Sequence, residues 1–209
     1  MDIFQIKENL RNYYDEEAEF RNENTSKTDW KLKARKNFLK LSKQENKKTL
    51  LELGAGAGYD SEYFKNNGLN VVAVDLSKEM VKKCVEKGIE TYELDFYDLS
   101  SLNKKFDCVY TINALLHVPG NDLNNVLNGI NSILNPNGLF YMGVYGGNDT
   151  ESEYVKIEIS EVSRFFAHHS ERYLRKTLEE IFQIIAFEKI KLENTGDIDF
   201  FYSITMKKK

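Results

Sequence analysis

The stretch Leu50-Leu-Glu-Leu-Gly-Ala-Gly-Ala-Gly-Tyr-Asp60 decides the fold expected for this chain. Its apolar beginning predicts a short strand, and its three glycines stand at alternate positions, Gly54, Gly56 and Gly58. Glycine has no Cβ, so the loop can turn tightly and its backbone can lie close to a ligand. A helix is expected directly afterwards, and the unpaired N–H groups at its start suit an anionic ligand group.

A second apolar run, Val71-Val-Ala-Val74, predicts another strand and ends in the acid Asp75. A carboxylate at a strand tip can accept hydrogen bonds from both ribose hydroxyls. Strand, glycine loop, helix, second strand and carboxylate together outline a nucleoside-cofactor site in a doubly wound α/β fold. The alternative is an ordinary tight turn between strand and helix, and the agreement of all five parts disfavours it.

The central part of the chain alternates between the two kinds of element. Strands are predicted at 49–53, 70–75, 90–94, 106–112 and 139–145, and helices at 60–67, from Ser77 to Gly88 and at 122–134. Ser77 is the expected cap of the second of these helices, with Met80, Val81, Cys84 and Val85 facing inward. Such alternation demands parallel strands with helices on both faces.

The flanking segments follow other patterns. Before the core, helices are expected over 5–20 and after Asp29, a candidate N-cap. Residues 146–169 break the rhythm and predict a long irregular segment of the kind that is often functional. A helix at 170–183 and strands at 187–193 and 199–206, joined around Gly196, are expected to close the chain.

Composition bounds the class of protein. The chain has 209 residues, 41% hydrophobic and 30% charged, with net charge −4, which fits one soluble globular domain. It shows no apolar run of membrane-spanning length and no signal peptide, so we expect a cytoplasmic protein without a membrane partner. The charge argues against a nucleic-acid substrate. Cys84 and Cys108 are expected to be reduced, buried thiols, and no metal site is expected.

At this point the sequence resembles a known family. Glu52-x-Gly54-x-Gly56-x-Gly58 is similar to motif I of the class I S-adenosylmethionine-dependent methyltransferases. The dinucleotide fingerprint has its third glycine one residue later, where this chain has Tyr59. Further similarities are Glu93-Leu-Asp95-Phe96 to the acidic segment after strand three, the stretch from Phe106 to Asn113 to strand four, and Leu134-Asn-Pro-Asn-Gly138 to the turn before strand five. They cover roughly residues 48–145, and the small bacterial "type 11" enzymes look most similar.

The resemblance implies a Rossmann-like, doubly wound α/β sheet of seven strands, mostly parallel with an antiparallel last strand and helices on both faces. One domain is expected over 1–209. It divides into a helical N-terminal cover at 1–45, a cofactor-binding core at 46–145, an acceptor-side insertion at 146–170, and a closing helix and strand pair at 171–209.

The implied cofactor is S-adenosylmethionine, with S-adenosylhomocysteine as product. Its methionine carboxylate would face the glycine loop, Asp75 would hold the ribose, and Asp95 could accept from the adenine amino group. Phe96 and Leu76 could pack on the two faces of the base; their alternative is plain core, and for Asp95 it is a turn or helix cap. The resemblance adds Asn113 and Glu52 near the cofactor's amino group. The predicted cofactor site is Glu52, Gly54, Ala55, Gly56, Gly58, Asp75, Leu76, Asp95, Phe96 and Asn113.

Methyl transfer from a sulfonium is a direct displacement, so the protein mainly positions the acceptor, although an amine or alcohol would profit from a general base. The catalytic candidates are His117 and Tyr145, near the ends of the fourth and fifth strands. The acceptor-site candidates are Tyr14, Trp30, His117, Tyr145, Arg164 and Phe165. Alternatives stay open: a structural histidine, a half-buried surface tyrosine, and a hydrophobic plug beside an exposed Arg164. Arg35 could pair with the methionine carboxylate or be a surface charge.

The leading hypothesis is a methyltransferase that acts on a small molecule, as a monomer or homodimer. A protein or RNA methyltransferase is disfavoured because the chain is barely longer than the family's core. It also reads Asn113-Ala-Leu-Leu where amino-methyltransferases have Asn/Asp-Pro-Pro-Tyr. An NAD-dependent oxidoreductase is disfavoured by the glycine spacing and the closing strands. A non-catalytic relative that only binds the cofactor stays open, because the chemistry needs no invariant side chain.

Overall fold

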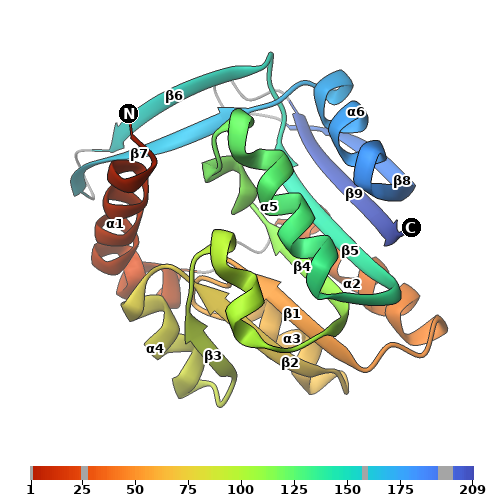
Figure 1. The fold of residues 1–209 in the computed structure, drawn as a ribbon. Coiled ribbons are helices and arrows are strands. Elements are labelled where there is room, and N and C mark those ends of the chain that lie inside the picture. The colour runs from red at the N-terminus through yellow and green to blue at the C-terminus, as the bar shows by residue number, and fades with distance from the viewer. Residues whose placement is uncertain (1, 25–27, 157–159, 193–199) are drawn as a thin grey trace.

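A seven-stranded sheet is the centre of the structure, a computed structural model that describes residues 2–24, 28–156, 160–192 and 200–209. The strand order is β3-β2-β1-β4-β5-β9-β8 (Figure 1). The strands of this sheet are β1 (Thr49–Leu53), β2 (Asn70–Asp75), β3 (Glu90–Glu93), β4 (Phe106–Ile112), β5 (Leu134–Tyr145), β8 (Phe182–Lys191) and β9 (Phe200–Lys208). The helices are α1 (Ile3–Glu23), α2 (Asp29–Gln44), α3 (Tyr59–Asn66), α4 (Lys78–Glu86), η1 (Phe96–Leu102), η2 (Leu115–His117), α5 (Gly120–Ile133) and α6 (Glu171–Ile181).

The direction of the strands confirms the predicted fold class. Neighbouring strands from β3 through β5 pair in parallel, whereas β9 is antiparallel to both β5 and β8. The chain leaves β1 toward β2 on one side and returns to β4 on the other, so the carboxyl ends of β1 and β4 border the switch point of the sheet. Ligands of doubly wound sheets bind at such a crevice.

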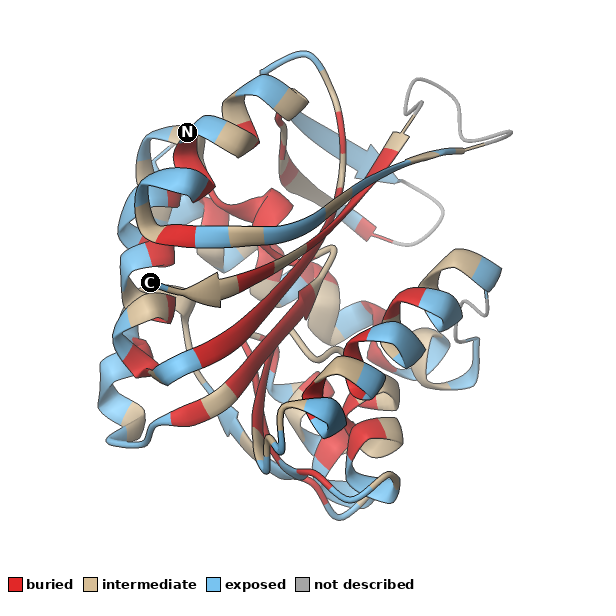
Figure 2. Cartoon of the chain, turned by 90° about the vertical axis from the view of Figure 1, so that its right-hand side faces the viewer, coloured by how far each residue is buried: buried red, intermediate tan, exposed pale blue. Residues whose placement is uncertain are grey.

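Apolar residues fill both faces of the sheet. One core cluster joins the strands to α5 and α6, and the second joins them to α2, α3 and α4, with Phe38, Phe64 and Cys84 fully covered. The central strands are accordingly buried over most of their length (Figure 2). The predicted burial of Cys84 and Cys108 as free thiols is confirmed. Buried parallel strands read as nearly continuous apolar runs, which is the pattern of Val71 to Val74.

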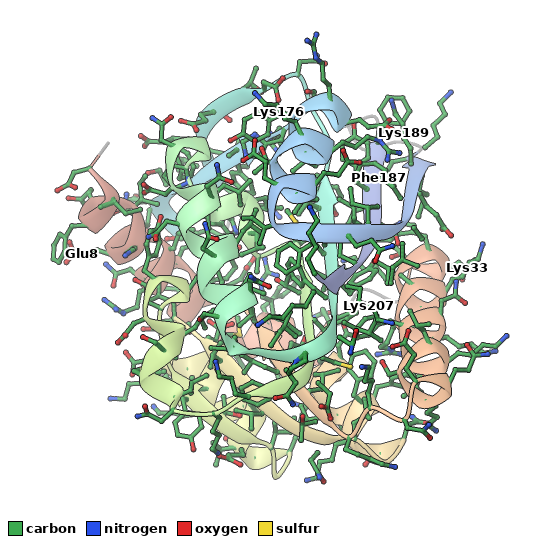
Figure 3. All side chains as sticks on the ribbon, turned by 45° about the vertical axis from the view of Figure 1, so that its right-hand side comes forward. Glu8, Lys33, Lys176, Phe187, Lys189 and Lys207 are labelled. Atoms are coloured by element: carbon green, nitrogen blue, oxygen red, sulfur yellow. The ribbon has the colours of Figure 1, made fainter. Side chains whose placement is uncertain are left out.

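The helices expected before the core are α1 and α2, which lie on different sides of the sheet (Figure 1). Helix α2 packs on the face that also carries α3, and only its first turns reach the cavity at the glycine loop. Glu8 on α1 and Lys33 on α2 point outward from the molecule (Figure 3). Inward residues of α1 include Leu10 and Tyr13, and its length also contacts β7 and α4. Asp15 fixes the α4 contact, because its Oδ1 accepts from the Ser77 hydroxyl at 2.6 Å and from the Glu79 amide at 3.1 Å.

We expect the substitution Asp15→Ala to loosen α1 over the sheet. It removes two hydrogen bonds to the start of α4, so the free energy of unfolding should fall by about 1–2 kcal/mol. Hydrogen exchange of residues 2–24 should become faster. Urea unfolding and exchange mass spectrometry measure both effects, and Glu16→Ala, at the next, exposed position, is the control. Equal exchange in the two variants would contradict the assigned role.

The segment 146–169 corrects the sequence prediction. It is not irregular: β6 (Thr150–Lys156) and β7 (Ser160–His168) form an antiparallel two-stranded sheet within the described residues. This hairpin reaches the N-terminal half of α1 (Figure 1), where Phe165 and Ala167 of β7 pack with Ile6 and Leu10. Every residue of β6 is exposed, so the strand carries no apolar alternation from which a sequence pattern could reveal it.

Smaller corrections concern the ends of two helices and the burial of one side chain. Asp29 is not the N-cap of α2; Thr28 holds that position without a side-chain bond. Ser77 does cap α4 by accepting from the Met80 amide at 3.1 Å. Val85 is 54% exposed rather than inward, because the buried face of this short helix follows Met80 and Cys84.

The boundaries in the C-terminal half also shift. The predicted helix 122–134 lies at Gly120–Ile133, and β5 begins at once, with a register break where the turn before Gly138 was expected. The predicted helix 170–183 lies at Glu171–Ile181, so β8 starts five residues before the predicted 187. Positions 193, 196 and 199 of the predicted closing strands and loop lie outside the described residues.

Candidate functional site

A cavity of about 1070 Å³ opens at the carboxyl ends of β1, β2 and β4. Its floor is the glycine loop with Glu52, Gly54, Ala55 and Gly56, and its wall includes Asp75. The other wall comes from the covering helices α1 and α2. The cavity therefore lies at the switch point of the sheet, where the sequence predicted a cofactor.

The glycine loop is held open by left-handed backbone conformations. Gly54, Gly56 and Gly58 have φ of +66°, +53° and +82°, values that side chains with a Cβ rarely adopt. The Gly54 amide donates to the Val74 carbonyl at 2.9 Å and so ties the loop to β2. A Cβ at Gly56 would meet no heavy atom within 4 Å, so this part of the loop borders free space.

Asp75 stands between the loop and the next helix. Its Oδ2 accepts from the Gly56 amide at 2.8 Å and its Oδ1 from the Ser77 amide at 2.9 Å. Burial raises the pKa of this carboxyl, and the two amide bonds oppose the rise. A carboxylate offers about four acceptor positions, so each oxygen keeps one for a further donor such as a ribose hydroxyl.

A second acidic group lies at the base of the loop. Glu52 is buried on β1 and accepts from the Ser61 hydroxyl of α3. Burial, and next the nearby Asp60, raise the pKa of Glu52 well above its usual value. Asp60 is itself paired with Arg35 at 2.8 Å. Arg35 and Asp60 both line the cavity, so Arg35 is not only a surface charge.

The charges of the cavity test whether S-adenosylmethionine fits. Glu52 adds no charge to this count, because its raised pKa favours the neutral acid. Among the other described residues that line the cavity, the carboxylates Glu17, Glu23, Asp60 and Asp75 still outnumber the basic Arg21, Lys31 and Arg35. A cofactor with a sulfonium, an ammonium and a carboxylate carries one net positive charge and complements this excess. The donor set, the ribose-type carboxylate and the glycine floor all fit the group.

The expected adenine end is partly closed by α1. Leu76 and Phe96 line the main cavity, and both also border a side pocket of about 40 Å³ together with Asp95. Asp95 Oδ2 pairs with Lys7 of α1 at 2.6 Å, and its Oδ1 caps η1 through the Tyr97 amide. Asp95 thus lies beside the cavity rather than on its wall.

Tyr14 and His117 meet at the cavity wall. The Tyr14 oxygen lies 2.7 Å from His117 Nε2, and His117 Nδ1 lies 2.7 Å from the Phe165 carbonyl oxygen. His117 belongs to η2, directly after β4, and Phe165 to β7. Helix, switch-point loop and hairpin thus converge at this pair, and both side chains line the cavity.

The other acceptor-site candidates are not on the cavity wall. Trp30 stacks on Phe201 with ring centroids 3.9 Å apart, and Tyr145 meets the same ring edge-on at 5.8 Å. Phe165 packs in an apolar cluster with Ile6 and Leu10. The Arg164 guanidinium lies over the rings of Tyr13 and Phe166, at 4.2 and 5.0 Å from their centroids.

Of the remaining predicted residues, Asn113 lines the cavity and Gly58 does not. Gly58 is the N-cap of α3, and a Cβ there would lie 2.8 Å from Cys84 Sγ. Its glycine is thus needed for close packing of α3 against α4. No group of three or more His, Cys, Asp or Glu side chains in the described residues is arranged to hold a metal ion.

Sequence reasoning missed Glu17, Arg21 and Lys31, which all line the cavity. Glu17 and Arg21 pair with each other, and the Glu17 carboxylate also accepts from the Tyr13 hydroxyl. A signal was present: Leu10, Tyr14, Glu17 and Arg21 recur at helical spacing and form one stripe on α1. Burial lowers the pKa of the Lys31 ammonium, which Asp60 partly offsets.

The burial of His117 predicts how stability depends on pH. Burial lowers its pKa from 6.5 to about 3, and the Phe165 carbonyl only partly opposes this. The folded state therefore keeps a neutral imidazole while the unfolded chain gains a proton below pH 6.5. This contribution to stability is complete above pH 6.5 and is lost as the pH falls toward about 3.

Replacing the histidine should remove this part of the pH dependence. Between pH 6 and pH 4.5 the free energy of unfolding of His117→Gln should fall less steeply than that of wild type, by up to about 1.4 kcal/mol per pH unit. Urea unfolding at a series of pH values measures the slope. His168→Gln, at a half-buried histidine, should change it less. Parallel curves for wild type and His117→Gln would contradict the burial argument.

The comparisons with known proteins agree with this geometry. A family described as a methyltransferase domain matches residues 27–192, so the chain belongs to this methyltransferase family. A curated relative, the C-methyltransferase NovU of Streptomyces niveus, is 29% identical over 100 residues, 46% of this chain and 23% of the relative. The match therefore spans less than a quarter of that relative's length.

Two solved structures share the fold over the whole chain. The 1,6-didemethyltoxoflavin-N1-methyltransferase of Burkholderia thailandensis, with bound 1,6-didemethyltoxoflavin and S-adenosylhomocysteine, has a TM-score of 0.74 at 19% identity, covering 100% of this chain and 91% of that one. The magnesium protoporphyrin IX methyltransferase of Synechocystis PCC 6803, with bound S-adenosylmethionine, has a TM-score of 0.73 at 14% identity, covering 100% and 98%.

The recognition of a class I, S-adenosylmethionine-dependent methyltransferase is therefore confirmed at the level of family and fold. No helix among the described residues has the length and apolarity to cross a membrane.

Proposed function

We propose that this chain transfers a methyl group from S-adenosylmethionine to a small molecule inside the cavity between the sheet and α1. The observation that carries the proposal is the cavity itself. Its volume of about 1070 Å³ reaches the upper end of the range for small-molecule sites. The nucleoside-type floor would take part of this volume, and the part beside Tyr14 and His117, which also line the cavity, would be left for an acceptor.

The residues that would hold the cofactor are those of the floor. Asp75 has acceptor positions for the ribose, and the glycine loop with the start of α3 faces the methionine part. Leu76 and Phe96 border the base, and the excess of carboxylates along the cavity offsets positive charge. When bound, the cofactor supplies an electrophilic methyl group; the protein's own part is to orient the acceptor and keep water out.

The enclosure favours a small acceptor over a macromolecule. Helices α1 and α2 lie over the cavity, and α1 is fixed at both ends by contacts to α4 and to β7. A protein or RNA segment would have to displace these helices to reach His117, which is buried. The two enzymes of the same fold are named for 1,6-didemethyltoxoflavin and magnesium protoporphyrin IX, which are not macromolecules, in agreement with this preference.

Calorimetric titration with S-adenosylmethionine and S-adenosylhomocysteine, with NAD as control, tests the cofactor. Micromolar binding of both and none of NAD is expected, and binding of NAD alone would overturn the proposal. Methyl-labelled S-adenosylmethionine is then incubated with a bacterial extract split by ultrafiltration. Label should appear in the small-molecule fraction; label confined to protein or RNA would identify a macromolecular acceptor instead.

A further inference from the structure

The hydrogen-bond chain through His117 has a fixed direction. A carbonyl oxygen only accepts hydrogen bonds, so His117 Nδ1, 2.7 Å from the Phe165 carbonyl, must carry a proton. The other ring nitrogen of a neutral imidazole is then an acceptor. His117 Nε2 therefore accepts from the Tyr14 hydroxyl at 2.7 Å, and the Tyr14 proton lies on the line between these two atoms.

This direction determines what Tyr14 can offer to a ligand. Its one hydroxyl proton is engaged by His117, so its oxygen presents only lone pairs to the cavity that both residues line. A ligand atom beside this oxygen has to bring its own proton. A carboxylate, ether or ketone oxygen placed there would find no donor in the pair, and unmet polar contacts in a buried site are costly.

Charged groups from two elements surround the pair. The Arg21 guanidinium of α1 lies 4.9 Å from the centroid of the Tyr14 ring, and Glu17 pairs with Arg21. From β7, Arg164 lies beside Tyr14, and His168 also faces His117. Burial raises the pKa of Tyr14, whereas Arg21 and Arg164 lower it. The net shift of this pKa is upward, so Tyr14 stays a neutral phenol that keeps its proton directed at His117.

Resting on the function proposed above, we infer that Tyr14 and His117 form a proton relay and that the acceptor reacts through a hydroxyl or an N–H group. As the acceptor's oxygen or nitrogen bonds to the methyl carbon and the carbon–sulfur bond breaks, the acceptor's proton moves to Tyr14 Oη. The proton of Tyr14 moves to His117 Nε2, while Nδ1–H stays on the Phe165 carbonyl. Burial and the guanidinium groups disfavour the imidazolium, so His117 holds the proton only transiently and passes it on to solvent.

The tautomer can be measured without any acceptor. Histidine ring ¹⁵N shifts, assigned with His117→Gln, should show His117 neutral with its proton on Nδ1 at pH 7, both free and with S-adenosylhomocysteine. The Nε2 signal should shift in Tyr14→Phe. A proton on Nε2 would mean that Tyr14 offers its own hydrogen to the cavity. An imidazolium at pH 7 would mean that Nε2 already carries a proton and cannot accept one from Tyr14. Either result overturns the inference.

The position of the label on the product tests the acceptor class. Methyl-labelled S-adenosylmethionine and the small-molecule fraction of the extract should give a product methylated on oxygen or nitrogen that carried hydrogen. The Tyr14→Phe rate should fall about 10²- to 10⁴-fold, with affinity for S-adenosylhomocysteine changed less than about threefold. Tyr173→Phe removes a hydroxyl bonded to the Gly120 carbonyl outside the cavity and should retain the wild-type rate.

His117 acts through Tyr14, so its test is a pH profile. The wild-type rate should be nearly constant above neutral pH, whereas the residual rate of His117→Gln should rise with pH as the acceptor ionises without help. Product labelled on carbon, sulfur or a carboxylate, or a Tyr14→Phe enzyme as fast as wild type, would overturn the inference while leaving the methyltransferase intact. Failure to bind S-adenosylhomocysteine would instead overturn the proposed function.

Discussion

Gly56→Ala is expected to weaken the binding of S-adenosylhomocysteine about 10- to 100-fold while leaving the protein folded. Gly56 lines the cavity, and its added Cβ would meet no protein atom within 4 Å. The methyl group would therefore occupy space that the ligand needs, and overpacking of about 1–3 kcal/mol corresponds to this loss of affinity. Calorimetric titration measures the change.

Two other glycines separate this effect from backbone strain. Gly68, after α3, also has a positive φ, +94°, and open space for a Cβ. Gly68→Ala and Gly56→Ala should each cost about 1–2 kcal/mol of stability, because alanine disfavours the left-handed region. Only Gly56→Ala should lose affinity. Equal affinity in these two variants would show that the glycine loop does not border the ligand.

Gly54→Ala should differ from both, since its Cβ would lie 2.4 Å from the Cβ of Ala114, with φ at +66°. Strain and overlap together should cost about 3–4 kcal/mol, which lowers the melting temperature of a chain of this size by about 10 °C. Thermal unfolding measures this loss. A melting temperature near that of Gly68→Ala would mean that β1 and the Ala114 turn separate easily.

The sheet and the glycine-loop floor of the cavity were predictable because short-range sequence determines them. Glycines at a tight turn, the apolar run of a buried strand and a carboxylate at a strand end can each be recognised within a few consecutive residues. Of the ten residues predicted for the cofactor, eight line the cavity; the exceptions are Gly58 and Asp95. Gly58 was grouped with the loop by its spacing, although its structural role is contact with Cys84.

The acceptor side was less predictable because it depends on contacts between distant segments. Tyr14 and His117 are 103 positions apart, and His117 and Phe165 are 48 apart. Their meeting requires that α1 pack on β7, whose partner β6 is exposed throughout and shows no strand pattern. Trp30 and Tyr145 were predicted to line the acceptor site, but both rings pack against Phe201 of β9 instead.

These differences have one physical origin. The floor is made by consecutive residues of a βαβ unit, so its geometry is carried by one stretch of chain. The wall beside Tyr14 and His117 is made by one helix face and one short turn, and the hairpin contacts His117 through the Phe165 carbonyl. Taken one at a time, the polar residues of this wall can also be explained as surface charges. Only their convergence around one cavity distinguishes Arg21 or Glu17 from ordinary helix-surface residues.

Asp75→Asn should reduce affinity for S-adenosylmethionine and S-adenosylhomocysteine by about two to three orders of magnitude. Hydrogen bonds to a charged partner contribute about 1.5–3 kcal/mol each, and the substitution affects the acceptor positions left for two ribose hydroxyls. It also turns an N–H donor toward the Gly56 or Ser77 amide, which now donate to the carboxylate. The loop that carries Gly56 should become less ordered as well.

Asp107→Asn is the matched control, because Asp107 likewise accepts from backbone amides, those of Lys48 and Thr49 at 2.9 and 3.1 Å. It lies at the start of β4, at the opposite end of the sheet from the cavity. Asp75→Asn should lose about 1–3 kcal/mol of stability, the cost of an unpaired buried amide, and Asp107→Asn should lose less, because the Lys48 amide is exposed and the Thr49 amide half-buried; urea unfolding measures both losses. Calorimetry should find normal affinity only in Asp107→Asn. If Asp75→Asn also bound normally, the ribose would not lie at Asp75, and the cofactor would have to bind in another orientation across the glycine loop.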